Sequence, residues 1–156
     1  MSSYTSRSEQ ETESIAARLA KTLRPGDVVA LFGGLGMGKT AFVRGLACGL
    51  GLDNTQVCSP TFALMNEYRR LGAPTLYHFD MYRVQGEDTL YATGFYDYLD
   101  SGGILAIEWS ENIAHALPDS AVRVVIELGE VDESRIISID NGQWTIDNDG
   151  VACGDD

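Results

Sequence analysis

Residues 33–40 read GGLGMGKT and complete the pattern G-x-x-x-x-G-K-[ST]. Glycines allow a backbone to bend closely around an anion and to turn its N–H groups toward it. At the end of this pattern, Lys39 can reach the β- and γ-phosphates of a nucleoside triphosphate, and the hydroxyl of Thr40 can ligate Mg²⁺. The segment therefore predicts a nucleotide site in which Lys39 is also a candidate for catalysis.

The residues on either side of this loop agree with that prediction. Residues 27–32 read DVVALF, an apolar run that is typical of a buried parallel strand. Residues 40–50 carry apolar side chains at helical spacing and lead to Gly51. A helix that begins at the loop directs the positive end of its dipole toward bound phosphates. The alternative, a glycine-rich turn with a chance Lys-Thr pair, does not explain these flanks.

A site that hydrolyses nucleotides also needs an acid at the end of a neighbouring strand, to hold Mg²⁺ directly or through water. Glu108 directly follows the apolar run 104–107 and fits this role. We therefore expect Thr40 and Glu108 to hold the metal. The alternative for Glu108 is a strand-end carboxylate in a salt bridge.

A second acid, Asp80, lies in the segment 76–82, LYHFDMY, in which side chains alternate between a predicted apolar and a predicted polar face. We expect Asp80 to position the attacking water or to act as its base. A surface acid paired with Arg83 is the alternative. His78 lies two residues earlier on the same face, where it could orient the site or serve as a hydrogen-bonded structural histidine.

Two further segments are less decisive. Trp109 directly follows Glu108 and could cover the site or simply pack in the protein. Ser59 and Thr61 flank Pro60, and such a loop after the phosphate-binding helix often senses the terminal phosphate, as a switch segment does. A plain turn is the alternative for this segment.

The remaining segments predict an α/β fold with a parallel core and antiparallel strands added toward the C-terminus. Ser8 opens an S-x-x-E capping box before an amphipathic helix over residues 9–23. Further helices are expected at 88–99 and 112–117, and further strands at 64–68, 122–128, 136–140 and, more weakly, 143–146. We expect one domain over residues 1–156, with about 1–7 and 147–156 flexible.

The composition limits the partners. Lys and Arg total 11 against 23 Asp and Glu, a formal net charge of −12, which argues against direct binding of a nucleic-acid backbone. The sequence contains no apolar run of about 18 residues and no secretory signal, so no membrane association is expected. The three cysteines are widely spaced and form no CxxC motif, which favours reduced thiols in a cytoplasmic protein.

Several classes of nucleotide-binding protein remain to be separated. A GTPase would carry a guanine-reading N/T-K-x-D motif, which this sequence lacks. A motor ATPase or helicase would usually be longer, with several more motifs. A small-molecule kinase usually has a lid rich in arginine, and only Arg69, Arg70 and Arg83 fall in the middle of the chain. A kinase stays possible beside a small accessory ATPase and a nucleotide-binding interaction protein that does not hydrolyse.

In combination, four motifs resemble the bacterial TsaE family, the ATPases of tRNA threonylcarbamoyladenosine (t6A) biosynthesis. These motifs are GGLGMGKT, CSPTFALMNEY, YHFDMYRV and ILAIEWSENI followed by LP. The resemblance runs from about Glu11 to Leu128. It implies a P-loop NTPase domain with three layers and a weak, Mg²⁺-dependent hydrolysis of ATP to ADP. It also implies TsaD-type and TsaB-type partner proteins that modify adenosine 37 of tRNA, which the ATPase would meet only indirectly.

The resemblance also suggests roles for individual residues. Asp80 would be needed for hydrolysis, and Trp109 would lie near the nucleotide or the partner surface. The segment from Glu9 to Thr12 would lie near the adenine, and Arg135 would contact the nucleotide. The residues implied for phosphate binding are Leu35, Gly36, Met37, Gly38, Lys39 and Thr40, with Thr40 and Glu108 on Mg²⁺.

This chain departs from the family pattern at two positions. Gly34 stands where an acidic residue is usual, and Ala41 stands where a second threonine is usual. The missing hydroxyl at Ala41 removes a hydrogen bond that we expect to reach the α-phosphate. Such a bond contributes about 0.5–1.5 kcal/mol. We therefore expect somewhat weaker nucleotide binding than in relatives.

Overall fold

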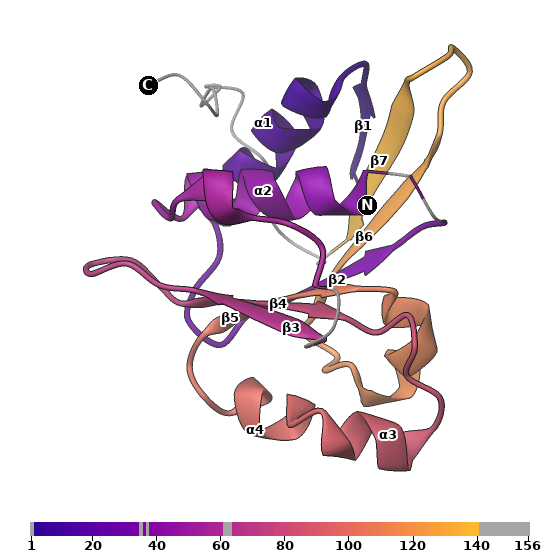
Figure 1. Ribbon diagram of the computed structural model, residues 1–156. Helices are drawn as coiled ribbons and strands as arrows, with labels where there is room; N and C mark the ends of the chain where they lie inside the picture. The colour runs from indigo at the N-terminus through magenta and orange to yellow at the C-terminus, as the bar shows by residue number, and fades with distance from the viewer. Residues whose placement is uncertain (1, 35, 37, 61–63, 141–156) are drawn as a thin grey trace.

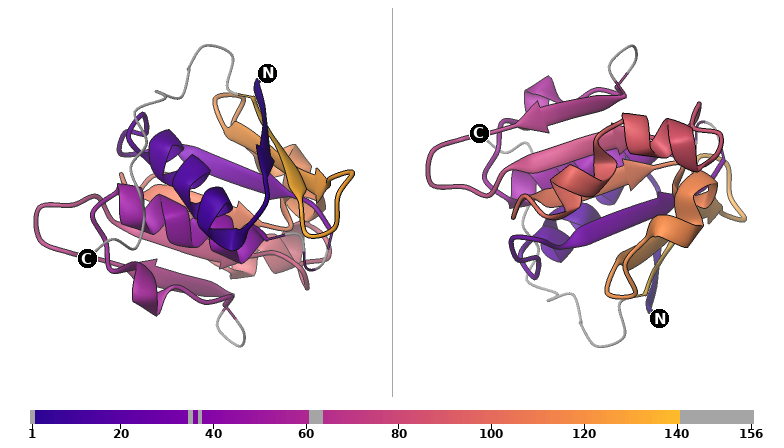
Figure 2. Two further views of the ribbon diagram at one scale, coloured as in Figure 1. Left: turned by 90° about the horizontal axis from the view of Figure 1, so that it is seen from above. Right: turned by 90° about the horizontal axis from the view of Figure 1, so that it is seen from below.

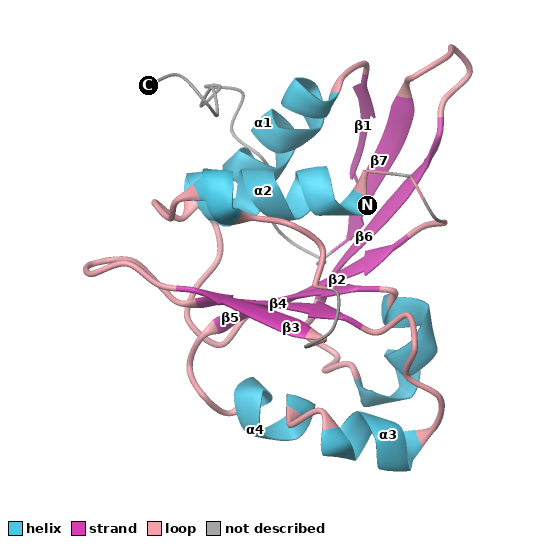
Figure 3. Ribbon diagram, in the orientation of Figure 1, coloured by secondary structure: helices cyan, strands magenta, loops and turns pink. Residues whose placement is uncertain are grey.

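The computed structural model describes residues 2–34, 36, 38–60 and 64–140. Within these residues, one mixed sheet lies between two layers of helices (Figures 1 and 3). The strands are β1 (Ser2–Ser6), β2 (Val28–Phe32), β3 (Met65–Tyr68), β4 (Leu76–Asp80), β5 (Ile104–Glu108), β6 (Val122–Leu128) and β7 (Arg135–Asp140). The helices are α1 (Glu9–Ala20), α2 (Lys39–Gly49), α3 (Glu87–Ala92) and α4 (Phe95–Leu99), with short 3₁₀ helices η1 (Asn54–Gln56) and η2 (Ser110–Ala116).

The strand order β1-β7-β6-β2-β5-β4-β3 places the parallel strands at the centre of the sheet. Strand β2 is parallel to β5 and β6, and β4 is parallel to β5. Strand β7 is antiparallel to β6, as expected for the C-terminal part of the chain. Antiparallel strands also close both edges, where β3 pairs with β4 and β1 pairs with β7. The predicted α/β fold with a parallel core is therefore confirmed.

The expectation that residues 1–7 are flexible was wrong, because Ser2–Ser6 forms the edge strand β1. It pairs with β7 along its whole length, from Ser2 opposite Ile139 to Ser6 opposite Arg135. The segment SSYTS lacks the apolar alternation that reveals a strand, so its backbone pairing with β7 could not be read from composition.

Other boundaries differ by a few residues. Helix α1 ends at Ala20 instead of residue 23. The helix expected over 88–99 is broken into α3 and α4 at Gly94, whose φ of 80° lies in the left-handed region and ends a helical turn. The weak strand at 143–146 and the expected flexible end at 147–156 lie outside the described residues.

The helices bury apolar side chains against opposite faces of the sheet. Helices α1 and α2 lie side by side on one face, and α3, α4 and η2 cover the other (Figures 1 and 2). Among the helices of the described residues, none has the length and apolar character that a bilayer span requires. The parallel strands β2, β5 and β4 all point the same way, so their carboxyl ends lie at one end of the sheet. Ligands bind at this end in sheets of this kind.

Helices α1 and α2 approach unusually closely. At Gly45, an added Cβ would lie 2.2 Å from the Glu13 carbonyl oxygen, and at Gly49 it would lie 2.5 Å from the Ala17 carbonyl oxygen. Only glycine permits such an approach of one helix to the backbone of another. This contact fixes α1 relative to α2, the helix that follows the phosphate loop.

We expect Gly45→Ala to lower the free energy of unfolding by about 1–3 kcal/mol, because the added methyl group would force the two helices apart. Cys48→Ala, on the same helix at a partly exposed position, is the control and should change stability far less. Chemical denaturation measures both variants. Equal midpoints for the two would show that the helices can separate at little cost.

Candidate functional site

The phosphate loop connects β2 to α2 in the conformation that its glycines allow. Gly36 has a φ of 77° and Gly38, which precedes the first residue of α2, has a φ of 97°. Side chains with a Cβ rarely adopt this left-handed region. The chain can therefore turn sharply into the N-terminus of α2. Leu35 and Met37, which the sequence assigns to the same loop, lie outside the described residues.

Lys39 lies at the start of α2 and is only 5% exposed. Its Nζ donates a hydrogen bond to the Gly33 carbonyl oxygen at 2.8 Å and lies 3.6 Å from the centroid of the Trp109 ring. Burial lowers the pKa of Lys39, while the nearby carboxylates of Glu111, Glu108 and Asp80 raise it. The ammonium group therefore lies at the loop between the Gly33 carbonyl, nearby carboxylates and the face of the Trp109 ring.

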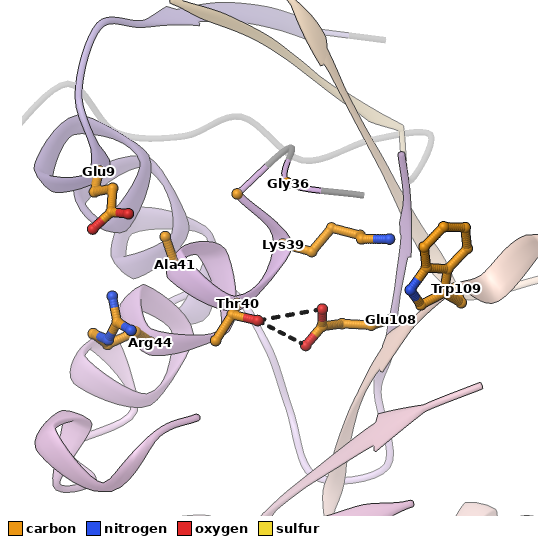
Figure 4. Close-up of a pocket in the computed structure, with 9 residues that line it drawn as sticks. Glu9, Gly36, Lys39, Thr40, Ala41, Arg44, Glu108 and Trp109 are labelled. Carbon is orange, nitrogen blue, oxygen red and sulfur yellow. Dashed lines mark hydrogen bonds between the residues drawn. The ribbon is translucent and has the colours of Figure 1, made fainter. Parts of the chain in front are cut away.

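The residues predicted to hold the metal lie together. Thr40 Oγ1 donates to the Glu108 carboxylate, with oxygens at 3.2 and 3.4 Å, and hydrogen-bonds to Ser59 Oγ at 2.6 Å (Figure 4). Glu108, at the end of β5, is only 4% exposed. Ser59 therefore reaches the site from the segment that we expected to behave as a switch, and that role stays a prediction. Thr61 lies outside the described residues.

The Thr40 hydroxyl and the Glu108 carboxylate suit a magnesium ion that binds together with phosphates. Mg²⁺ prefers hydroxyl, carboxylate and phosphate oxygens and is usually bound through one or two carboxylates together with the phosphates of a substrate. Among the described residues, no group of three His, Cys, Asp or Glu side chains could hold a metal ion alone. One hydroxyl and one carboxylate, with room for phosphate oxygens, therefore suit a metal–nucleotide complex better than a permanently bound ion.

Glu108 has a second partner that the sequence did not assign. His78 in β4 is fully buried, and its Nε2 lies 2.5 Å from Glu108 Oε2. The face of β4 that the sequence predicted to be polar is buried at His78, because helices cover both faces of the sheet. Both of its possible roles, orienting the site and serving as a hydrogen-bonded structural histidine, agree with this contact.

Asp80 ends β4 directly opposite Glu108, which ends β5. Its Oδ1 accepts a hydrogen bond from the Tyr82 backbone N–H at 3.0 Å. Partial burial raises the pKa of Asp80, and the negative charge of Glu108 raises it further, while the Tyr82 bond, His78 and Lys39 act in the opposite direction. The structure thus brings the two predicted acids to adjacent strand ends.

Trp109 adopts a left-handed conformation, with a φ of 60°, at the turn that follows β5. A residue with a bulky side chain takes this conformation only when its surroundings enforce it. The turn places the indole against Lys39 Nζ and 4.9 Å from the Tyr82 ring, centroid to centroid. Trp109 therefore lies beside Lys39 and also packs against the apolar core, and its role at the site stays a prediction.

A pocket opens around the first turn of α2, between α1, the loop and the end of β5 (Figure 4). The residues that line it are Glu9, Gly36, Gly38, Lys39, Thr40, Ala41, Arg44, Glu108 and Trp109. In Figure 4, Glu9 and Arg44 flank Ala41 on one side, while Lys39 and Glu108 lie on the other. Glu9 therefore lines the pocket on the side away from Glu108, and its expected place near the adenine stays a prediction.

A smaller, adjoining pocket brings in Arg135. It is lined by Ser8, Glu9, Thr12, Gly36, Gly38, Ala41, Glu133 and Arg135. Arg135, the first residue of β7, donates from Nη2 to the Gly36 carbonyl oxygen at 3.4 Å. The two pockets share Glu9, Gly36, Gly38 and Ala41, so together they form one cavity surface from the residues predicted to bind the metal to β7.

Sequence reasoning missed two residues of the site. Arg44 lies one helical turn after Thr40, so the periodicity of α2 could have indicated that it lines the same pocket. Glu111 accepts a hydrogen bond from the Gly33 N–H at 3.4 Å, across 78 positions of sequence. Only its place three residues after Glu108 could have drawn attention to it.

The chain was compared with known proteins. The sequence model of the family described as threonylcarbamoyl adenosine biosynthesis protein TsaE matches residues 6–137. Among curated proteins, the chain is 41% identical over 127 residues to the tRNA threonylcarbamoyladenosine biosynthesis protein TsaE of Rickettsia conorii, covering 80% of this chain and 70% of that one. The protein of the same name from Rickettsia bellii is 40% identical over 137 residues, covering 86% and 91%.

A curated protein and a solved structure from Bacillus subtilis are similar to this chain as well. The Bacillus subtilis protein of that name is 40% identical over 127 residues, covering 81% of this chain and 78% of its own. Among solved structures, the crystal structure of Bacillus subtilis YdiB superimposes with a TM-score of 0.69 at 33% identity, covering 88% of this chain and 83% of that one. Sequence and fold therefore point to the same group of proteins.

The raised pKa of Asp80 leads to a prediction about stability. A carboxyl group whose pKa is higher in the folded state favours folding when protonated, so its ionised form at neutral pH costs stability. We expect Asp80→Asn to raise the midpoint of thermal unfolding of the nucleotide-free protein at pH 7, since the amide oxygen can still accept from Tyr82.

The gain should shrink as the pH falls through the pKa of Asp80, because the wild-type group then loses its charge. Thermal unfolding of both proteins between about pH 3 and pH 7 measures this, because carboxyl groups ordinarily titrate at about pH 4 and the pKa of Asp80 lies above its ordinary value. A difference in midpoint that stays constant across that range would contradict the pKa shift.

Proposed function

The chain belongs to the TsaE family, and on that premise we propose that it is a Mg²⁺-dependent ATPase whose nucleotide cycle supports the modification of tRNA to threonylcarbamoyladenosine. A role in threonylcarbamoyladenosine biosynthesis accompanies the family match over residues 6–137. Hydrolysis is our own proposal. The observation that supports it is the meeting of Lys39, Thr40, Glu108 and Asp80 at the N-terminus of α2.

ATP would bind with its phosphates at the turn between β2 and α2. The loop N–H groups and the positive end of the α2 dipole would attract the phosphates, and Lys39 would exchange its bond to the Gly33 carbonyl for a phosphate oxygen. Glu9 and Arg135 border the part of the pocket away from Glu108, where the nucleoside would lie. Arg44 would add a positive charge near the α-phosphate.

Thr40 Oγ1 and the Glu108 carboxylate would hold Mg²⁺ at the phosphates. A bound Mg²⁺ neutralises the charge that develops on the phosphate oxygens during transfer. Asp80, one strand away from Glu108, would orient the attacking water and accept its proton. Partial burial favours this second role, because a carboxylate with a raised pKa is a stronger base.

We further propose that the partners are TsaD-type and TsaB-type proteins, and that tRNA is met only through their complex. The net charge of −12 supports an action on proteins, since a chain this acidic would repel an RNA backbone. The role in tRNA modification also implies a cytoplasmic location. The alternative, a small-molecule kinase, would transfer the phosphoryl group to a metabolite instead of to water.

The proposed roles can be tested by substitution. Lys39→Ala should abolish ATP binding, because it removes the buried ammonium group. Asp80→Asn should leave ATP binding within about twofold of wild type and lower turnover by about 10²-fold or more, the contribution typical of a positioned base. Asp88→Asn, an exposed acid of α3, is the matched control and should change neither.

The measurements are calorimetric ATP binding and release of inorganic phosphate, with and without a reconstituted TsaD/TsaB pair. Turnover by Asp80→Asn at the wild-type rate would remove that residue from the mechanism. Phosphate that appears on a metabolite instead of in solution would favour the kinase.

Ala41 yields a separate prediction. It lines both parts of the pocket, and its side chain carries no donor where relatives of this family usually have a threonine. We expect Ala41→Thr to strengthen ADP binding by about 0.5–1.5 kcal/mol through one added hydrogen bond. Ala41→Val, which has the same shape without the hydroxyl, is the control. Calorimetry that finds equal affinities for Thr and Val at this position would refute the proposed hydrogen bond.

A further inference from the structure

His78 is a buried polar side chain that the proposed mechanism does not yet use. It lies in the middle of β4 with no exposed surface, and its Nε2 is 2.5 Å from Glu108 Oε2. In the sheet, His78 pairs with Ala106, so its ring reaches diagonally to the residue two positions further along β5. A polar ring in this interior position needs a reason, because burial of a polar group is costly unless it is hydrogen-bonded.

We propose that His78 is a positioning residue, whose Nε2–H fixes the Glu108 carboxylate in the orientation that receives the nucleotide-bound Mg²⁺. The proposal rests on the function proposed above. Ligands of metal ions are commonly oriented by such outer hydrogen bonds, which also keep them in the required protonation state. Here the oriented ligand is the carboxylate, and the histidine is its outer partner.

The surroundings of the ring indicate which nitrogen carries the proton. Within the described residues, Nδ1 of His78 is buried and has no hydrogen-bond partner. A proton on Nδ1 would therefore be an unpaired buried donor, which proteins avoid. A proton on Nε2 is paired with the Glu108 carboxylate. The tautomer with its proton on Nε2 therefore pairs its donor with Glu108 and leaves Nδ1 as a buried acceptor without a partner among the described residues.

The two carboxylate oxygens of Glu108 differ in their hydrogen bonds, and this difference suits a metal ligand. Oε2 accepts from His78 and, at 3.2 Å, from Thr40 Oγ1, whereas Oε1 has, among the described residues, only the 3.4 Å contact with Thr40. Because Glu108 is only 4% exposed, little water can compete for its orientation. His78 therefore holds one oxygen in place and leaves the other with unused capacity beside the Thr40 hydroxyl.

Substitution of His78 by either of two amide side chains, glutamine or asparagine, can test this role. The side-chain nitrogen of glutamine can occupy the position of Nε2, whereas that of asparagine can reach only the position of Nδ1. We expect His78→Asn to lose about 10- to 100-fold of the gain in ADP affinity that Mg²⁺ provides, the range typical of outer-shell substitutions. His78→Gln should retain most of that gain.

The measurement is ADP binding by calorimetry, once with Mg²⁺ and once with EDTA. With EDTA, both variants should bind ADP as the wild type does, since the phosphate loop is unchanged. In ATPase assays, raising the Mg²⁺ concentration should restore turnover of His78→Asn, which a packing defect would not allow. Equal behaviour of the two variants, or an equal loss in EDTA, would overturn the proposal.

The proposed function and this inference fail in different ways. If the wild-type protein binds ADP equally well with Mg²⁺ and with EDTA, the metal site itself is wrong, and the positioning role is lost with it. If His78→Asn does not fold, the ¹⁵N chemical shifts of the His78 ring in the wild-type protein decide instead. A protonated Nε2 supports the proposal, and a neutral ring with its proton on Nδ1 overturns it.

Discussion

The site depends on the parallel alignment of β2, β5 and β4. The register of β4 against β5 brings Asp80 opposite Glu108. The parallel pairing of β2 with β5 brings the phosphate loop to the same end of the sheet. A slip of one residue in β4 would move Asp80 away from Glu108 and turn it toward the other face of the sheet. The apolar cores on both faces oppose such a slip, so packing far from the nucleotide fixes the geometry of the chemistry.

The same alignment of strands brings ionisable side chains together in an interior where burial disfavours their charged forms. Lys39 and Glu108 are almost fully buried, and Asp80 is partly buried beside Glu108. The neighbouring opposite charges, the His78 bond and the Gly33 carbonyl offset part of that cost. In the proposed complex, phosphates beside Lys39 and a metal ion beside Glu108 would offset more of that cost. The residues proposed for activity therefore contribute less to stability while the ligand is absent.

The sequence predicted the parts of the site that a short motif or the end of a strand defines. Lys39 and Thr40 followed from local spacing, and Glu108 and Asp80 followed from their places after apolar or alternating runs. The bond between His78 and Glu108 joins residues 30 positions apart, and it depends on which strands become neighbours. The edge strand β1 could not be predicted for a related reason, since its polar residues become a strand only by pairing with β7.

The acidity of the chain is compatible with the proposed binding of a polyanion, because the two effects act over different distances. Salt screens exposed charges beyond about 8–10 Å, so the net charge of −12 weakly affects a phosphate that lies within a pocket. In the proposed complex, the α2 dipole and Lys39 would dominate close to the phosphates, with Arg44 and Arg135 nearby. The acidic surface instead influences slower encounters between large molecules, where it favours a basic protein surface over an RNA backbone. We therefore propose that the cations of the pocket act on the nucleotide, whereas the net charge of the chain acts on the choice of partner.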